Sequence, residues 1–134
     1  LVVVGEGQAR PVVSVLEERL SRAGTPVVSL STLGAAERAW LDAISARAGI
    51  LVIAVGRETR LGDAALAAAQ SAGVPAGVLV DSPVSALARP PLARVVPCDS
   101  HGANPSLVPM VAVAQALADA LARPAERRLA PAAA

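Results

Sequence analysis

The sequence predicts an α/β domain in which a five-stranded parallel sheet carries helices on both faces, as a three-layer sandwich. Short apolar runs rich in Val, Ile and Leu alternate with segments in which apolar residues recur every three or four positions. The run 50–55 is apolar throughout, which is typical of a strand buried on both faces of a parallel sheet. The connections are short, so we expect one domain over residues 1–123 and a flexible tail over 124–134.

The composition excludes several classes of function. The 134 residues, 54% of them hydrophobic, contain no run of the ~20 apolar residues that a membrane span requires, so we expect a cytoplasmic protein. The net charge of +1 and the absence of Phe and Tyr argue against contact with membranes or nucleic acid. All basic residues are Arg, which excludes a Schiff-base lysine, and the single Cys excludes an internal disulfide. With no Cys/His cluster for zinc, we expect no cofactor.

The first half of the sequence predicts two strand–helix pairs. The chain starts directly on a strand, without Met or a signal peptide, so we expect a further segment before Leu1. Pro11 suits the first position of a helix, and Gly24 is a good residue to end it. The predicted elements are the strand 1–4, the helix that runs from Arg10 to its C-cap at Gly24, the strand 26–30 and the helix 34–48.

The second half continues the alternation and ends in an unusually apolar helix. The predicted elements are the strand 50–55, the helix 61–72, the strand 76–80, a short helical turn over 81–88, an edge strand 93–97 and the helix 106–123. Small residues dominate the helix 61–72, so it can lie close to the sheet. The helix 106–123 is apolar nearly all round at its start, so we expect it to be deeply buried or covered by a second subunit. This pattern favours a homodimer.

Two corners where a strand passes into a helix are the candidate ligand site. At the carboxyl edge of a parallel sheet, the first turn of a helix presents unpaired N–H groups and a positive dipole end, which attract anions. The corners lie at Gly5–Arg10 and Gly56–Arg60, and a polar cluster follows the second strand. The candidate ligand-binding residues are Gly5, Gly7, Gln8, Ser31, Thr32, Gly56, Arg57, Thr59 and Arg60.

Other interpretations of these residues stay open. Gly5-x-Gly7 could begin a dinucleotide fingerprint, but Arg10 replaces the third Gly and no acid follows the second strand, which disfavours that cofactor. Arg57 and Arg60 could grip an anion, or they could be solvated surface residues. The hydroxyls of the polar cluster could face the ligand, or they could satisfy local backbone groups.

The two corners together resemble the SIS (sugar isomerase) domain, a phosphosugar-binding α/β fold of the flavodoxin or Rossmann type. Members carry Gly-x-Gly-x-Ser at the first corner and Ser-x-Ser-Gly-x-Thr at the second. Here Ala9 stands where the first hydroxyl belongs, and only Thr59 survives of the three hydroxyls of the second motif. The resemblance covers roughly residues 1–123 and implies that the ligand is a sugar phosphate or a related small anion.

Catalysis is a further possibility under this resemblance. Glu58 could shuttle a proton between adjacent sugar carbons, or it could simply complement the dipole of the following helix. His101 could assist ring opening, or it could be an exposed loop residue. Asp99-Ser100-His101 contains the residue types of a hydrolytic triad, but three consecutive residues cannot align as one.

The family resemblance leads to one expected function with two alternatives. We expect a sugar-phosphate-binding SIS domain that senses its ligand and dimerises within a larger protein such as a transcriptional regulator. One alternative is the second SIS domain of an aldose–ketose isomerase such as glucosamine-6-phosphate synthase, although the chain contains no Lys for the catalytic position. The other alternative is a non-catalytic interaction domain whose pocket has decayed.

Overall fold

A parallel β-sheet forms the middle layer of the structure, a computed structural model that describes residues 1–44, 49–56, 60–82, 85, 87–88, 93–96 and 106–129. The strand order is β2-β1-β3-β4-β5, and every neighbouring pair is parallel. The body of the sheet consists of β1 (Val2–Val4), β2 (Val28–Leu30), β3 (Ile50–Ala54) and β4 (Ala76–Val80). The three residues of β5 (Ala93–Val95) pair with the end of β4. The predicted α/β class with a parallel sheet is confirmed.

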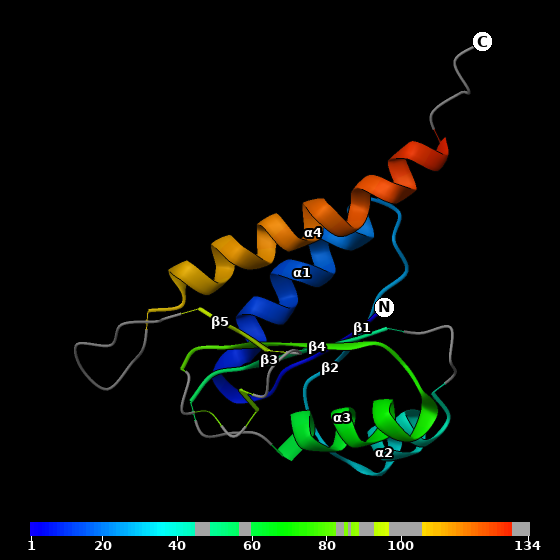
Figure 1. The fold of residues 1–134 in the computed structure, drawn as a ribbon, viewed down its shortest axis with the longest axis vertical. Helices are drawn as coiled ribbons and strands as arrows, with labels where there is room; N and C mark the ends of the chain where they lie inside the picture. The colour runs from blue at the N-terminus through cyan, green and yellow to red at the C-terminus, as the bar shows by residue number, and fades with distance from the viewer. Residues whose placement is uncertain are drawn as a thin grey trace.

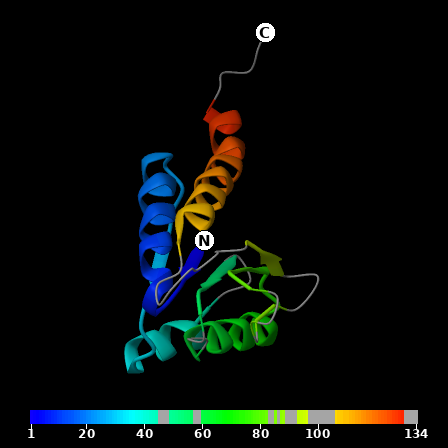
Figure 2. The same ribbon diagram turned by 90° about the vertical axis from the view of Figure 1, so that its left-hand side faces the viewer.

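Helices cover both faces of the sheet, as predicted (Figure 1). The helices are η1 (Gly7–Ala9), a short 3₁₀ turn, followed by α1 (Arg10–Arg22), α2 (Ala35–Asp42), α3 (Arg60–Ala72) and α4 (Val108–Leu129). The view in Figure 2 shows α1 and α4 side by side on one face, with α2 and α3 on the other. The chain is therefore a three-layer sandwich.

The core consists of two apolar layers separated by the sheet. Along β3, Leu51 and Ile53 pack under α1 and α4, whereas Ile50, Val52 and Ala54 pack against α3. This alternation follows from the two-residue period of a strand. No residue of β3 is more than 9% exposed, which confirms that this strand is buried on both faces.

Local sequence signals set the limits of α1. Pro11 lies at the start of the helix, where its missing N–H is not needed. At the other end the Thr25 amide donates to the Leu20 carbonyl (2.9 Å) and the Gly24 amide to the Ser21 carbonyl (3.1 Å). These two hydrogen bonds form a Schellman motif with Gly24 at the position after the cap. The predicted end of this helix is confirmed.

The predicted length of α2 is wrong, because the helix ends at Asp42 instead of continuing to residue 48. The Ile44 amide turns back to the Leu41 carbonyl (3.2 Å), which closes the last turn. The β-branched Ile44 then packs against the core layer under α3, so burial of its side chain outweighs continuation of the helix. Residues 45–48 lie outside the described part of the chain.

The N-terminus of α2 is held by Glu37. Its Oε2 accepts a hydrogen bond from the Gly34 amide (3.1 Å), and its Oε1 accepts one from the Thr32 hydroxyl (3.0 Å). Hydrogen bonding to its own backbone amide, then to the Thr32 hydroxyl and the Gly34 amide, lowers the pKa of the Glu37 carboxyl. Glu37 thus supplies the acidic half of a capping box at the carboxyl end of β2.

The last helix is longer than predicted, since α4 starts at Val108 and continues to Leu129 instead of ending at Arg123. The backbone of 124–129, within the segment expected to be a tail, thus continues the helix, while 130–134 lie outside the described residues. Pro124 removes one backbone donor but its fixed φ is compatible with a helix, and the following Ala, Glu and Arg residues favour helix.

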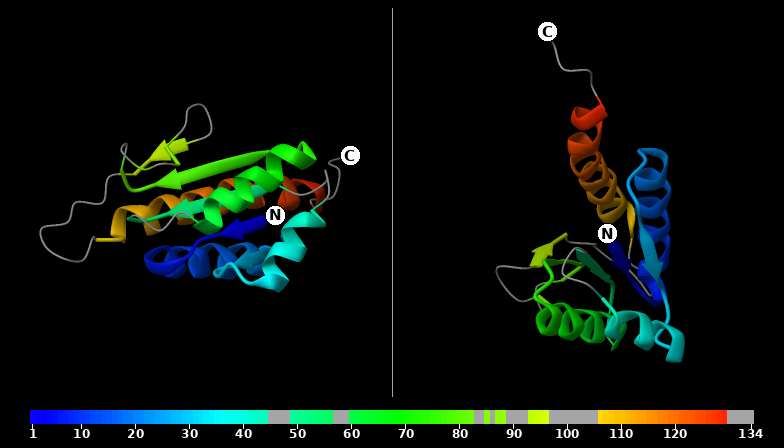
Figure 3. Two further views of the ribbon diagram at one scale, coloured as in Figure 1. Left: turned by 90° about the horizontal axis from the view of Figure 1, so that it is seen from below. Right: turned by 90° about the vertical axis from the view of Figure 1, so that its right-hand side faces the viewer.

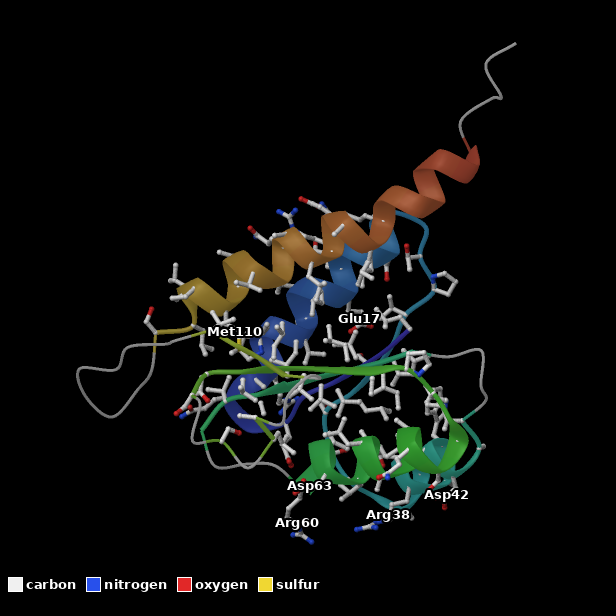
Figure 4. All side chains as sticks on the ribbon, viewed as in Figure 1. Glu17, Arg38, Asp42, Arg60, Asp63 and Met110 are labelled. Atoms are coloured by element: carbon white, nitrogen blue, oxygen red, sulfur yellow. The ribbon has the colours of Figure 1, made fainter. Side chains whose placement is uncertain are left out.

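Contact with α1 and the sheet buries one face of α4, which contains Met110, Ala114, Ala118 and Ala122. The small alanines let the two helices approach closely, and Figure 4 shows Met110 directed toward the sheet. An ion pair between Arg19 Nη1 and Asp119 Oδ1 (3.6 Å) links the helices at an exposed edge, where such a pair contributes little. In the described part of the chain, no helix is long and apolar enough to cross a membrane.

Replacement of Met110 by Ala tests the docking of α4. Met110 is completely buried, so the Met110→Ala variant should lose about 2–5 kcal/mol in free energy of unfolding. Val108 lies on the same helix but is 74% exposed, so Val108→Ala should stay within about 0.5 kcal/mol of the wild type. Urea titration followed by circular dichroism measures both. Equal effects of the two substitutions would contradict this packing.

The lowered pKa of the Glu37 carboxyl predicts how the free energy of unfolding depends on pH. Because its pKa in the folded state lies below the ordinary value of 4.5, ionised Glu37 stabilises the fold above that pH. This contribution disappears as the pH falls through the lowered pKa. The difference in free energy of unfolding between the wild type and Glu37→Gln should therefore shrink between about pH 5 and pH 3. A difference that stays constant over this range in urea titrations would contradict the assignment.

Candidate functional site

The candidate site lies where the connections of the sheet diverge. The connection after β1 leads through α1 on one face to β2, whereas the connection after β3 leads through α3 on the other face to β4. Strands β1 and β3 are direct neighbours with Val4 opposite Val52, so their carboxyl ends lie together. Figure 3 shows that the strands point the same way, toward the loops of this edge. Such a switch point is where open α/β sheets bind ligands.

Gly5 shapes the first corner. It is buried, and its amide donates to the Leu30 carbonyl of β2 (3.0 Å). A Cβ on Gly5 would lie 2.5 Å from Val13 Cγ2 and 3.2 Å from the Ile53 carbonyl oxygen, so only glycine fits here. The close approach brings the start of α1 against the end of β3. The following turn η1 then carries Gln8 at the exposed edge of the sheet.

Gly56 shapes the second corner and lies beside the first. Its φ of +71° is a conformation that other residues adopt only with strain. The Gly56 amide donates to Asp81 Oδ2 (3.1 Å) at the end of β4. A Cβ on Gly56 would lie 3.9 Å from Gln8 Oε1, so the Gln8 side chain reaches from the first corner to the second.

Glu6 joins the two corners directly. Its Oε1 accepts a hydrogen bond of 2.8 Å from the amide of Leu61, the second residue of α3. The Glu6 side chain is half-buried, whereas Gln8 is exposed. The structure therefore brings both predicted corners to one edge of the sheet, the position at which open α/β sheets have their ligand crevice, and three described glycines and Gln8 from the predicted ligand set lie there.

The predicted hydroxyl and guanidinium residues are arranged differently. Ser31 is half-buried after β2, and the hydroxyl of Thr32 is engaged by Glu37. Arg60 is exposed and points away from the sheet (Figure 4). The predicted ligand residues Arg57 and Thr59 and the predicted catalytic residues Glu58 and His101 lie outside the described residues. Their roles stay predictions.

Sequence reasoning missed two carboxylates of this crevice. In the sequence, Glu6 is the variable residue between Gly5 and Gly7, so the motif gives it no role. Asp81 is the first residue of a predicted helical turn, so it too is not a candidate for the site. Both follow strands that flank β3, since β1 and β4 are its two neighbours. Parallel pairing places the ends of neighbouring strands together, so an acid after each flanking strand was the available signal.

One groove in the described part of the chain lies away from the two corners. A groove of about 560 Å³ lies between α2 and α3, where Arg38, Asp42 and Ser71 supply its polar atoms. Its lining includes Ser71 and Ala72 from the last turn of α3, which precedes the amino end of β4. Among the side chains that the structure describes, no three of His, Cys, Asp and Glu gather as a metal site.

Comparison with known proteins places the fold in a family. No protein-family model matches the sequence, and no curated protein matches it either. The sugar isomerase domain of an RpiR transcription factor from Sphaerobacter thermophilus is 32% identical, with a TM-score of 0.84 over 96% of this chain and 73% of that chain. The Escherichia coli CFT073 protein c3406, solved in complex with a sugar phosphate, has a TM-score of 0.68 at 20% identity, over 93% of this chain and 70% of that chain.

The second of these likenesses concerns the fold alone, because its identity is low. The first combines the fold with a sequence identity of 32% over nearly the whole of this chain. The chain belongs to the SIS (sugar isomerase) domain family.

Proposed function

We propose that this SIS domain binds a sugar phosphate in the crevice between the carboxyl ends of β1 and β3. The observation that carries the proposal is the direct contact of the two corners, in which Glu6 reaches the Leu61 amide and Gln8 reaches Gly56. The first turns of α1 and α3 start at this edge, so the dipoles of the two helices favour an anionic group, and the Leu61 amide that Glu6 holds is a donor that such a group could take. The complex of the E. coli neighbour with a sugar phosphate supports the same ligand class.

The residues at the corners imply a weak affinity. Ala9 and Gly56 offer no hydroxyl, so backbone amides and the Gln8 amide are the neutral donors on the described side of the crevice. Each missing hydrogen bond to a charged group costs about 1.5–3 kcal/mol. Two such losses move the dissociation constant from micromolar toward millimolar. In this proposal Arg57 and Thr59 add donors from the second corner, and Ser31 lies at the neighbouring strand end. The Arg60 side chain points away from the sheet, so it has to turn toward the corner before it can contribute.

A sensing role is the form of this function that the comparisons support best. The neighbour at 32% identity is the sugar isomerase domain of a transcription factor. We therefore infer that the chain acts as the ligand-sensing module of a larger regulator. Isomerase chemistry, with Glu58 as base and His101 assisting ring opening, is the alternative, as is the second SIS domain of an isomerase.

The outer face of α4 supports a homodimer. The exposed residues of this face, from first to last, are Val108, Pro109, Ala112, Val113, Ala116, Asp119, Ala120 and Leu121. All but Asp119 are apolar, and all but Leu121 follow the helical repeat along one side. Monomeric proteins rarely expose a continuous apolar stripe, and a second copy of the same helix is self-complementary to it. We propose this face as the dimer interface.

Ligand binding can be tested by the thermal stability of the purified chain. Arabinose 5-phosphate and glucose 6-phosphate are added at millimolar concentration, with the unphosphorylated sugars as controls. A ligand at 100 times its dissociation constant should add about 2.7 kcal/mol to the free energy of unfolding. Gln8→Ala should weaken binding about fivefold to tenfold through loss of one hydrogen bond. The control Gln70→Ala, an exposed residue near the other end of α3, should leave binding unchanged. No stabilisation by any sugar phosphate would contradict the proposal.

The dimer can be tested by sedimentation velocity. Val113 is 36% exposed on the outer face of α4, so Val113→Glu would bury a charge in the proposed interface. We expect the wild type to sediment as a dimer and Val113→Glu as a monomer with unchanged circular dichroism. Gln70→Glu adds the same charge on α3, on the other face of the sheet, and should stay dimeric. A monomeric wild type would refute the interface.

A further inference from the structure

The amide at the start of α3 already has an anionic partner from the chain itself. Glu6 Oε1 lies 2.8 Å from the Leu61 nitrogen, although the two residues are 55 positions apart. Leu61 belongs to the first turn of the helix, where the N–H groups have no partner within the helix. A phosphate that used this amide would have to take the place of the Glu6 carboxylate.

A second carboxylate reinforces this arrangement. Asp81 Oδ2 accepts the Gly56 amide at 3.1 Å, so acids from the strands on either side of β3 hold amides of the β3–α3 connection. The guanidinium of Arg60, at the first position of α3, points away from the sheet (Figure 4). An incoming dianion would therefore approach two negative side chains at the same edge.

We propose that Glu6 is a built-in competitor for the phosphate group, and that it lowers the affinity of the site. The proposal rests on the proposed function, namely that a sugar phosphate binds in this crevice. Binding displaces the Glu6 carboxylate from the Leu61 amide and so releases the contact between the β1–α1 loop and α3.

The charge of Glu6 can be removed without removal of the hydrogen bond. In Glu6→Gln the side-chain oxygen can still accept the Leu61 amide, while the repulsion between the side chain and a phosphate disappears. Repulsion between unit charges about 4 Å apart in water corresponds to roughly a fivefold change in affinity, and a dianion raises it to tenfold or more. The control Glu18→Gln makes the same change in net charge at an exposed residue of α1 that pairs with Arg22.

Isothermal titration of the wild type, Glu6→Gln and Glu18→Gln with inorganic phosphate and with arabinose 5-phosphate tests the proposal. We expect Glu6→Gln to bind both about tenfold more tightly than the wild type, and Glu18→Gln to match the wild type. The gain should be similar for the two ligands, because both carry the phosphate group that Glu6 repels, and it should shrink as salt is added. In nuclear magnetic resonance spectra the Leu61 amide signal of Glu6→Gln should shift at lower ligand concentration.

The outcomes separate the two proposals. If the wild type binds arabinose 5-phosphate and Glu6→Gln binds it equally or more weakly, Glu6 is not a competitor, while the proposed function stands. If only Glu6→Gln binds, the competition is supported, while the proposed function fails for the wild type. If none of the proteins binds either ligand, both proposals are overturned.

Discussion

The parallel pairing of β1 with β3 is the constraint on which the rest of the structure depends. Val2, Val3 and Val4 face Ile50, Leu51 and Val52 in register, so the two strands end at the same level. Their connections leave on opposite faces of the sheet, which is the arrangement in which open α/β sheets bind ligands at the strand ends. Gly5 makes this geometry possible, because any side chain there would collide with Val13 and the backbone of β3. Without that close approach, the starts of α1 and α3 would not share one edge.

The chemistry of this edge differs from the motif pattern that the SIS resemblance implies. Hydroxyl groups are missing at the positions of Ala9 and Gly56, while carboxylates of Glu6 and Asp81 hold the backbone amides. A hydroxyl supports an anion by donating to it, whereas a carboxylate competes with it for the same donors. The same helix ends can thus serve two purposes: they can bind a ligand, or they can tie neighbouring strand ends together in its absence.

The helix α4 has apolar residues on both its buried face and its exposed face. Its inner face buries Met110 and three alanines against α1 and the sheet, and its outer face presents apolar residues to solvent. The sequence is consequently apolar nearly all round over its first turns, a pattern that periodicity alone cannot divide into an inner and an outer face. Only the position of α1 decides which residues are core and which are available to a partner.

Local signals in the sequence by themselves determined the class of fold, the two glycine corners and the limits of α1. Apolar runs, proline at a helix start and glycine after its end each act within a few residues, so they can be interpreted without a structure. The end of α2, the continuation of α4 past Pro124 and the bond from Glu6 to Leu61 were decided by the tertiary structure. The α2 helix ends before Ile44, whose side chain packs against the core layer under α3. Glu6 accepts the Leu61 amide, 55 positions away, because β1 and β3 are neighbours. Contacts of that kind depend on which strands pair, and strand pairing is a property of the whole chain.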